Sequence, residues 1–177
     1  MLDHTTNRHK GINEMIATAQ TPKVPGDDMA GEFTDVAALQ QFLLAGKAIL
    51  SVRSRKTGVH FTFKFTRPPP SPDAVRACPI WVNVLSGPNN ETDYIYLGTI
   101  WPHSAWQYRH GTKSRVGVDA PSVSAVRWFI SLMQRDSAKL FAQVEVWHEG
   151  RCGRCGRKLT VPDSVASGFG PECIQHV

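Results

Sequence analysis

The carboxy-terminal cysteine pattern constrains this chain more than any other feature. Cys152 and Cys155 are separated by two residues, and Cys173 follows after seventeen more. A Cys-x2-Cys pair places two thiolates on one tight turn, at a spacing suited to tetrahedral zinc. Gly153 and Gly156 are expected to let this turn adopt positive φ and direct its amides at the sulfurs. The spacing therefore predicts a Zn2+ site near the end of the chain.

Two histidines compete as the fourth ligand of this site. His176 lies three residues after Cys173, and the two would share a face if a helix begins just before the cysteine. That would be a treble-clef-like arrangement, with one ligand pair on a turn and one on a helix. His148 lies four residues before Cys152, at the end of a predicted strand. Both candidates remain open.

Other uses of the cysteines fit the sequence less well. A redox dithiol lacks the βαβ context that it needs, and iron–sulfur clusters usually take four cysteines. Cys78 stands alone between an alanine and a proline, and is expected to be a buried or incidental thiol unless the fold brings it to the metal. An open catalytic zinc with three protein ligands and water is a less favoured alternative, because no glutamate lies in a motif typical of a general base.

The segment between the ligands is expected to form a very small folded unit. Residues 162–168 predict a short helical turn that ends at a glycine. The apolar side chains around it should form a miniature core over the metal: Leu159, Val161, Val165 and Phe169. A unit of this size cannot fold on apolar burial alone, so metal binding would supply much of its folding free energy.

Two runs in this segment have a specific resemblance. Cys-Gly-Arg-Lys-Leu-Thr-Val-Pro-Asp-Ser-Val and Gly-Phe-Gly-Pro-Glu-Cys resemble a small cysteine-motif, zinc-finger-like domain of unknown function, common in proteins of bacteriophages, plasmids and their hosts. The resemblance covers Cys152–Cys173 only. It implies a zinc-finger-like module in a phage or mobile-element protein, without implying an activity. That family does not dependably place a histidine after the last cysteine, which mildly favours His148.

The rest of the chain predicts an α+β fold with an antiparallel sheet of four to five strands and two packed helices. Alternation of Phe61, Phe63 and Phe65 with polar residues makes residues 60–66 the clearest strand. Further strands are expected at 48–54, 80–85, 94–100 and 143–147, whereas residues 101–118 look irregular. We expect a disordered tail over residues 1–32, an α+β domain over 33–147 and the zinc-binding module over 148–177.

Both helices are predicted from periodicity and from their first residues. Thr34 is expected to cap the first, which should end near Gly46. Pro121 lies in the first turn of the second, where apolar residues recur at i, i+3, i+4 and i+7: Val126, Phe129, Ile130 and Met133. Each helix should pack one face on the sheet.

Charge and hydropathy bound the cellular setting. No apolar run reaches the roughly 18 residues of a membrane span, and residues 1–10 lack the apolar core of a signal peptide. These features predict a soluble, cytoplasmic protein without a membrane partner. Residues 34–177 contain seventeen Lys/Arg and ten Asp/Glu. This basic excess favours a polyanionic partner.

Two segments combine the residue types that bind nucleic acid. Residues 101–115 contain three aromatic rings and three full positive charges but no acid, and rings stack on unpaired bases while cations neutralise phosphate. The predicted contact residues here are Trp106, Tyr108, Arg109, Lys113 and Arg115. The cysteine turn adds Arg151, Arg154, Arg157 and Lys158. The opposing interpretation is that Trp101 and Trp106 cover the core and the cations form a solvated rim.

These observations predict a zinc-stabilised protein that binds DNA or RNA, favours single strands and acts by binding rather than catalysis. The alternative is a protein-interaction factor that inhibits or recruits a host complex, such as an anti-defence protein. A zinc hydrolase or nuclease is a third hypothesis. A small-molecule substrate is not expected, because no Gly-x-Gly-x-x-Gly or phosphate-binding loop is present.

Overall fold

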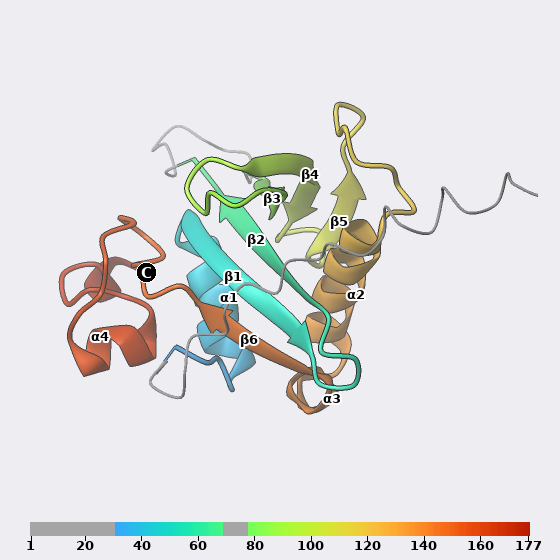
Figure 1. Cartoon of the computed structure of the whole chain (residues 1–177). Coiled ribbons are helices and arrows are strands. Elements are labelled where there is room, and N and C mark those ends of the chain that lie inside the picture. Colours follow the sequence, from blue (N-terminus) through green and yellow to red (C-terminus); the bar gives the residue numbers. More distant parts are fainter. Residues whose placement is uncertain (1–30, 69–77) are drawn as a thin grey trace, which may run out of the picture.

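The computed structural model of the protein describes residues 31–68 and 78–177. An antiparallel sheet of six strands forms the centre, in the order β5-β4-β3-β2-β1-β6. Helices α1 and α2 lie against one face of this sheet, and the carboxy-terminal segment forms a compact lobe beyond its end (Figure 1). The α+β class and the antiparallel pairing predicted from the sequence are confirmed.

Five of the strands follow one another as a meander, and the sixth returns beside the first. Their bounds are β1 Lys47–Ser54, β2 His60–Thr66, β3 Ile80–Leu85, β4 Tyr94–Trp101, β5 Gln107–His110 and β6 Val144–His148. In β2, Phe63 and Phe65 are fully buried and Phe61 is half-buried, while Lys64 lies on the opposite face. The period-2 pattern therefore identified the core face of this strand.

The helices close the core from one side. α1 spans Val36–Leu44, and the Asp35 carboxylate, not Thr34, caps it by accepting from the Ala38 amide at 2.8 Å. α2 spans Pro121–Arg135, begins at the predicted proline and buries all four of its predicted apolar positions. α3, Ser137–Gln143, was not predicted; the Asp136 side chain caps it by accepting from the Lys139 amide.

β5 corrects the prediction that residues 101–118 are irregular, and it raises the strand number above the expected four to five. The turn before it holds Ala105 and Trp106 at φ of 51° and 53°, a left-handed conformation that costs free energy for residues other than glycine. The Gln134 side-chain amide donates to the Ala105 carbonyl and so supports the turn from α2. This long-range contact explains why local sequence did not predict the hairpin.

A short extended segment continues the sheet beyond β6. The His148 amide donates to the Gly31 carbonyl at 3.1 Å, and the Phe33 amide donates to the Val146 carbonyl at 2.8 Å. Gly31 and Glu32, the last two residues of the predicted tail, thus pair with β6. The predicted tail of residues 1–32 otherwise lies outside the described residues. Among the helices of residues 31–68 and 78–177, none has both the length and the apolar character needed to cross a membrane.

Candidate metal centre

Three cysteine sulfurs converge in the carboxy-terminal lobe. The Sγ atoms of Cys152, Cys155 and Cys173 all lie within 4.8 Å of one another. Thiolates bound to one Zn2+ lie about 3.8 Å apart, given Zn–S distances of about 2.3 Å and tetrahedral angles. Cys152 is buried, Cys173 is half-buried and Cys155 is exposed, so the group is enclosed on one side and accessible on the other. This cluster could hold a metal ion.

A tight loop, residues 151–158, positions the first two sulfurs, and we call it the knuckle. The Gly156 amide donates to the Cys152 carbonyl at 2.9 Å, and the Cys152 amide donates to the Arg157 carbonyl at 2.8 Å. Gly156 has the positive φ, 79°, that its place in the turn predicted. Gly153 does not adopt positive φ, so the expectation for that glycine was wrong.

The environment of the sulfurs favours negative charge on one thiol and opposes it on another. Burial acts to raise the pKa of Cys152, but backbone amides of the knuckle and of Gly170 point at its sulfur and bring the pKa down to about 7. Burial and the neighbouring sulfurs raise the pKa of Cys173 to about 11. Adjacent thiolates repel one another, and a bound divalent cation relieves such repulsion.

The segment between the knuckle and Cys173 forms the predicted helical turn. α4 spans Pro162–Ser167, and Gly168 ends it at φ 77°. Leu159 and Phe169 are buried and Val165 is half-buried, but Val161 is 56% exposed. The miniature core therefore contains three of the four residues expected. After Cys173 the chain ends in a single 3-10 turn, η2, Ile174–His176.

The lobe is joined to α1 through an aromatic cluster. The Phe42 ring packs against Gly153 and Gly168, where an added Cβ would lie 2.7 and 2.8 Å from ring atoms. Ring centroids of Phe42 and Phe169 are 5.6 Å apart. Phe169 and Cys152 belong to the same buried cluster as the core of the sheet. The cysteine lobe thus depends on the α+β domain for part of its packing.

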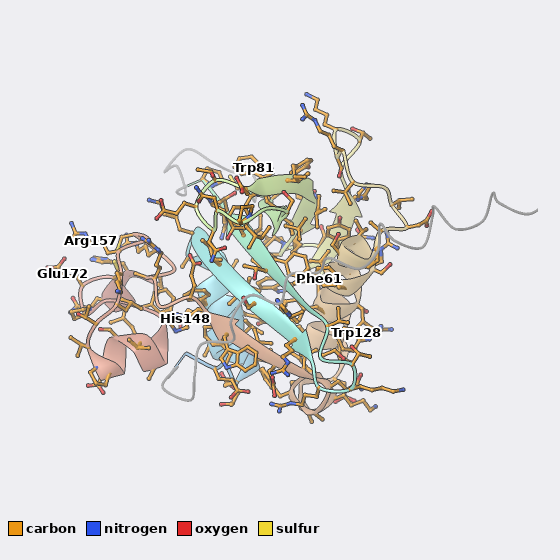
Figure 2. The ribbon with its side chains drawn as sticks, viewed as in Figure 1. Phe61, Trp81, Trp128, His148, Arg157 and Glu172 are labelled. Atoms are coloured by element: carbon orange, nitrogen blue, oxygen red, sulfur yellow. The ribbon has the colours of Figure 1, made fainter. Side chains whose placement is uncertain are left out.

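His148 belongs to this aromatic junction, and the structure places it outside the sulfur cluster. Its Nδ1 accepts from the Gly150 amide at 3.1 Å, so its Nε2 carries the proton and donates to the Val165 carbonyl at 2.7 Å. Only 1% of the residue is exposed, and burial lowers its pKa, which keeps the ring neutral. Figure 2 shows His148 between the sheet and the lobe. Both ring nitrogens are engaged by the backbone, which leaves none for a metal.

The other candidates for a fourth ligand also lie outside the cluster. Within residues 31–68 and 78–177, no histidine, carboxylate or further cysteine joins the three sulfurs. His176 is exposed on η2, and its amide donates to the Cys173 carbonyl at 3.2 Å. Cys78 is half-buried at the start of the segment that leads into β3.

The residues predicted to bind nucleic acid divide into inward rings and outward cations. Trp106 and Tyr108 pack against the core on the helix side, and the Tyr108 hydroxyl donates to the Leu97 carbonyl at 3.3 Å. Burial raises the pKa of Tyr108 to about 12. Arg109, Lys113 and Arg115 are exposed. The interpretation in which Trp101 and Trp106 cover the core therefore holds for Trp106 and extends to Tyr108, whereas Trp101 is not among the residues packed on the core.

The knuckle cations are exposed, and one of them, Arg151, forms ion pairs. Arg151 pairs with Glu91 at 3.1 Å and approaches Glu149 at 3.9 Å. Arg154, Arg157 and Lys158 form no ion pair with any residue that the structure describes. Sequence reasoning missed Lys47, whose Nζ donates to the Cys155 carbonyl at 3.4 Å. Only the path of β1 past the knuckle brings this lysine to the site.

The fold and site define an α+β protein with a carboxy-terminal three-cysteine module that is suited to metal binding. A protein-family model, described as a family of unknown function (DUF6011), matches residues 145–177. The match covers all of β6 except its first residue, together with the cysteine lobe. No curated protein and no solved structure matches the chain.

Proposed function

We propose that this protein binds nucleic acid through a zinc-stabilised basic knuckle, acting without catalysis and favouring single strands. The observation that supports this most directly is a group of cations at the cysteine cluster that have no acidic partner among the residues described: Arg154, Arg157 and Lys158. A surface lysine or arginine is normally either paired with a neighbouring acid or isolated in solvent. Three on one loop, held by a metal, can contact successive phosphates.

Zinc is the metal proposed for the cluster. Three thiolates and a tetrahedral preference suit Zn2+ better than the oxygen-seeking Mg2+ or Ca2+. We propose His176 as the fourth ligand, because His148 has both nitrogens engaged and His176 follows Cys173 on the same short turn. The knuckle would then supply two ligands and the final turn two, which is the treble-clef-like arrangement expected from the sequence.

Metal binding and phosphate binding are connected through the loop backbone. Backbone hydrogen bonds within the knuckle and two to neighbouring segments at Gly153 hold part of this loop, and metal ligation by Cys152 and Cys155 would fix the rest of its shape. Once closed, the loop fixes the directions of its arginine side chains. Arg forms bidentate contacts with phosphate. Loss of metal should therefore weaken binding although every basic side chain of the knuckle is still present.

The test is a titration of labelled 20-nucleotide single strands, DNA and RNA, and the matching duplex, at about 50 and 200 mM salt. We expect salt-sensitive association that is strongest for single strands and that weakens with a chelator. In a variant with Arg154, Arg157 and Lys158 all changed to Gln, log affinity should fall less steeply with log salt. The magnitude of the slope should decrease by about 2.

The matched control removes three exposed cations elsewhere, by changing Lys56, Arg127 and Arg135 to Gln. It alters net charge equally but leaves the knuckle intact. If both triple variants lose the same affinity, binding reflects overall charge and not the knuckle. Absence of salt-sensitive binding to every nucleic acid tested would refute the proposed function.

A further inference from the structure

We propose that the sheet face opposite the helices is a second contact surface, on which unpaired bases of a single strand stack with Trp81 as the main ring. This rests on the proposed function, because it assumes that nucleic acid is the partner. It replaces Trp106 and Tyr108, the two rings that the sequence suggested as contacts, because both pack on the core. We call this surface the open face.

The open face follows from strand alternation. Within residues 31–68 and 78–177, helices pack on the sheet from one side only (Figure 1). Residues at alternate positions of each strand therefore project away from the helices. Aromatic residues recur at these outward positions: Trp81, Tyr94, Tyr96, Trp101 and Trp147.

Trp81 is the most accessible ring of this set. It lies on β3, an inner strand of the sheet, and is 42% exposed. Its neighbours in the ladder are Thr66 on β2 and Thr99 on β4. Threonine side chains are too short to cover an indole, so a face of the ring remains open. Tryptophan is one of the residue types enriched at binding interfaces.

Cations accompany the rings at two points of the open face. Lys64 Nζ lies 5.0 Å from the Tyr94 ring centroid, and the Arg109 guanidinium lies 5.8 Å from that of Trp101. Neither cation forms an ion pair with an acid among the residues described. Rings beside cations provide both stacking and phosphate neutralisation, which is how proteins bind single strands without sequence readout.

The open face adjoins the knuckle. Lys47 begins β1 on the same side as Ser51, and its Nζ reaches the Cys155 carbonyl. Burial raises the pKa of Glu149, and the nearby cations Arg151 of the knuckle and Lys64 of the open face both oppose this shift. A strand bound at the knuckle could thus continue over the sheet.

The chemistry of the face favours a single strand over other partners. Polar and charged side chains separate most of its rings, with Ile49 and Leu85 as aliphatic members and with Glu145 paired to Arg53 and Arg55. The rings therefore do not form the continuous apolar patch typical of a protein interface core. In a duplex, bases are stacked on one another and hidden from protein rings. Only unpaired bases present both π-faces to a platform of this kind.

Trp81→Ala tests the proposal, with Trp128→Ala as its control. Trp128 lies on α2 and is 41% exposed, so the two rings match in type and exposure, and Figure 2 shows them far apart. We expect Trp81→Ala to weaken binding of a labelled 20-nucleotide thymidine or uridine strand by about 5- to 150-fold. The salt slope and duplex affinity should be unchanged, because no cation is lost.

Two further measurements separate stacking from misfolding. Trp81→Phe should recover most of the affinity, since phenylalanine retains a stacking face. Binding should quench the tryptophan fluorescence of the wild type more than that of Trp81→Phe. Trp128→Ala should bind within about twofold of the wild type.

The outcomes distinguish this inference from the proposed function. If Trp81→Ala binds as the wild type does while the knuckle variant loses affinity, the open face is refuted and the knuckle remains. If Trp128→Ala weakens binding equally, Trp81 has no special role and the inference is also refuted. If the wild type binds no nucleic acid, both proposals fail.

Discussion

At the scale of single residues, the junction between the cysteine lobe and α1 depends on a close approach of Phe42 to Gly153. Glycine was expected at position 153 because of a positive φ, but Gly153 does not have one. Space is the reason instead: a Cβ there would lie 2.7 Å from Phe42 and 3.3 Å from Phe169. Both neighbours are buried aromatic rings, which cannot move freely to make room for a Cβ.

Gly153→Ala should therefore overpack this junction and destabilise the protein by about 1–3 kcal/mol. Gly170→Ala is the control within the same lobe, because a Cβ at Gly170 meets nothing within 4 Å and its φ is not positive. Urea unfolding followed by circular dichroism measures both. Equal stability of the two variants would show that Phe42 does not restrict position 153.

At the scale of elements, the β4–β5 pairing is the part of the sheet least evident from the sequence. Gly98 on β4 pairs with His110 on β5. A Cβ on Gly98 would lie 2.2 Å from the Arg109 carbonyl oxygen, a backbone atom. The backbones of the two strands approach so closely that only glycine fits at this position.

Gly98→Ala should separate β5 from β4 and expose its amides. We expect faster hydrogen exchange at residues 107–110, with the β1–β2 hairpin unaffected. Gly117→Ala is the control, since no atom lies within 4 Å of a Cβ there and its φ is not positive. Unchanged exchange in β5 of Gly98→Ala would contradict the close approach.

At the scale of the whole molecule, a metal ion would join two parts that share one core. The three sulfurs lie close together within the lobe, and the ring cluster joins the lobe to α1. Only a few apolar side chains of the lobe are buried, so its order should depend on the metal.

Purified protein should contain about one zinc per chain, and chelation should lower its stability. A metal present at about 100 times its Kd contributes about 2.7 kcal/mol, which corresponds to roughly 5–10 °C in Tm for a chain of this size. Cys155→Ser removes an exposed ligand without disturbing packing. The Tm of Cys155→Ser should lie near that of the chelated wild type, and the chelator should not change it. A wild type without stoichiometric transition metal, or with a Tm that the chelator does not change, would contradict the zinc site.

Sequence patterns predicted the features in which neighbouring residues determine their own structure. The Cys-x2-Cys turn, the Phe63 and Phe65 side of β2 and the proline start of α2 depend on local geometry. Prediction failed where two neighbouring residues compete for one role or where a distant residue decides. The helix cap shifted from Thr34 to Asp35 because either side chain could cap. β5 escaped notice because α2 supports the turn before it.

The sequence by itself determined the three-cysteine cluster and the alternation of the clearest strand, because cysteine spacing and side-chain period are properties of the local chain. Tertiary structure decided which surface each group faces. Trp106 and Tyr108 point to the core while Trp81 points outward, because the side of the sheet that receives the helices buries one set of alternate residues and leaves the other exposed. It also engaged His148 in the aromatic junction, because the fold brings the Gly150 amide and the Val165 carbonyl to its two nitrogens.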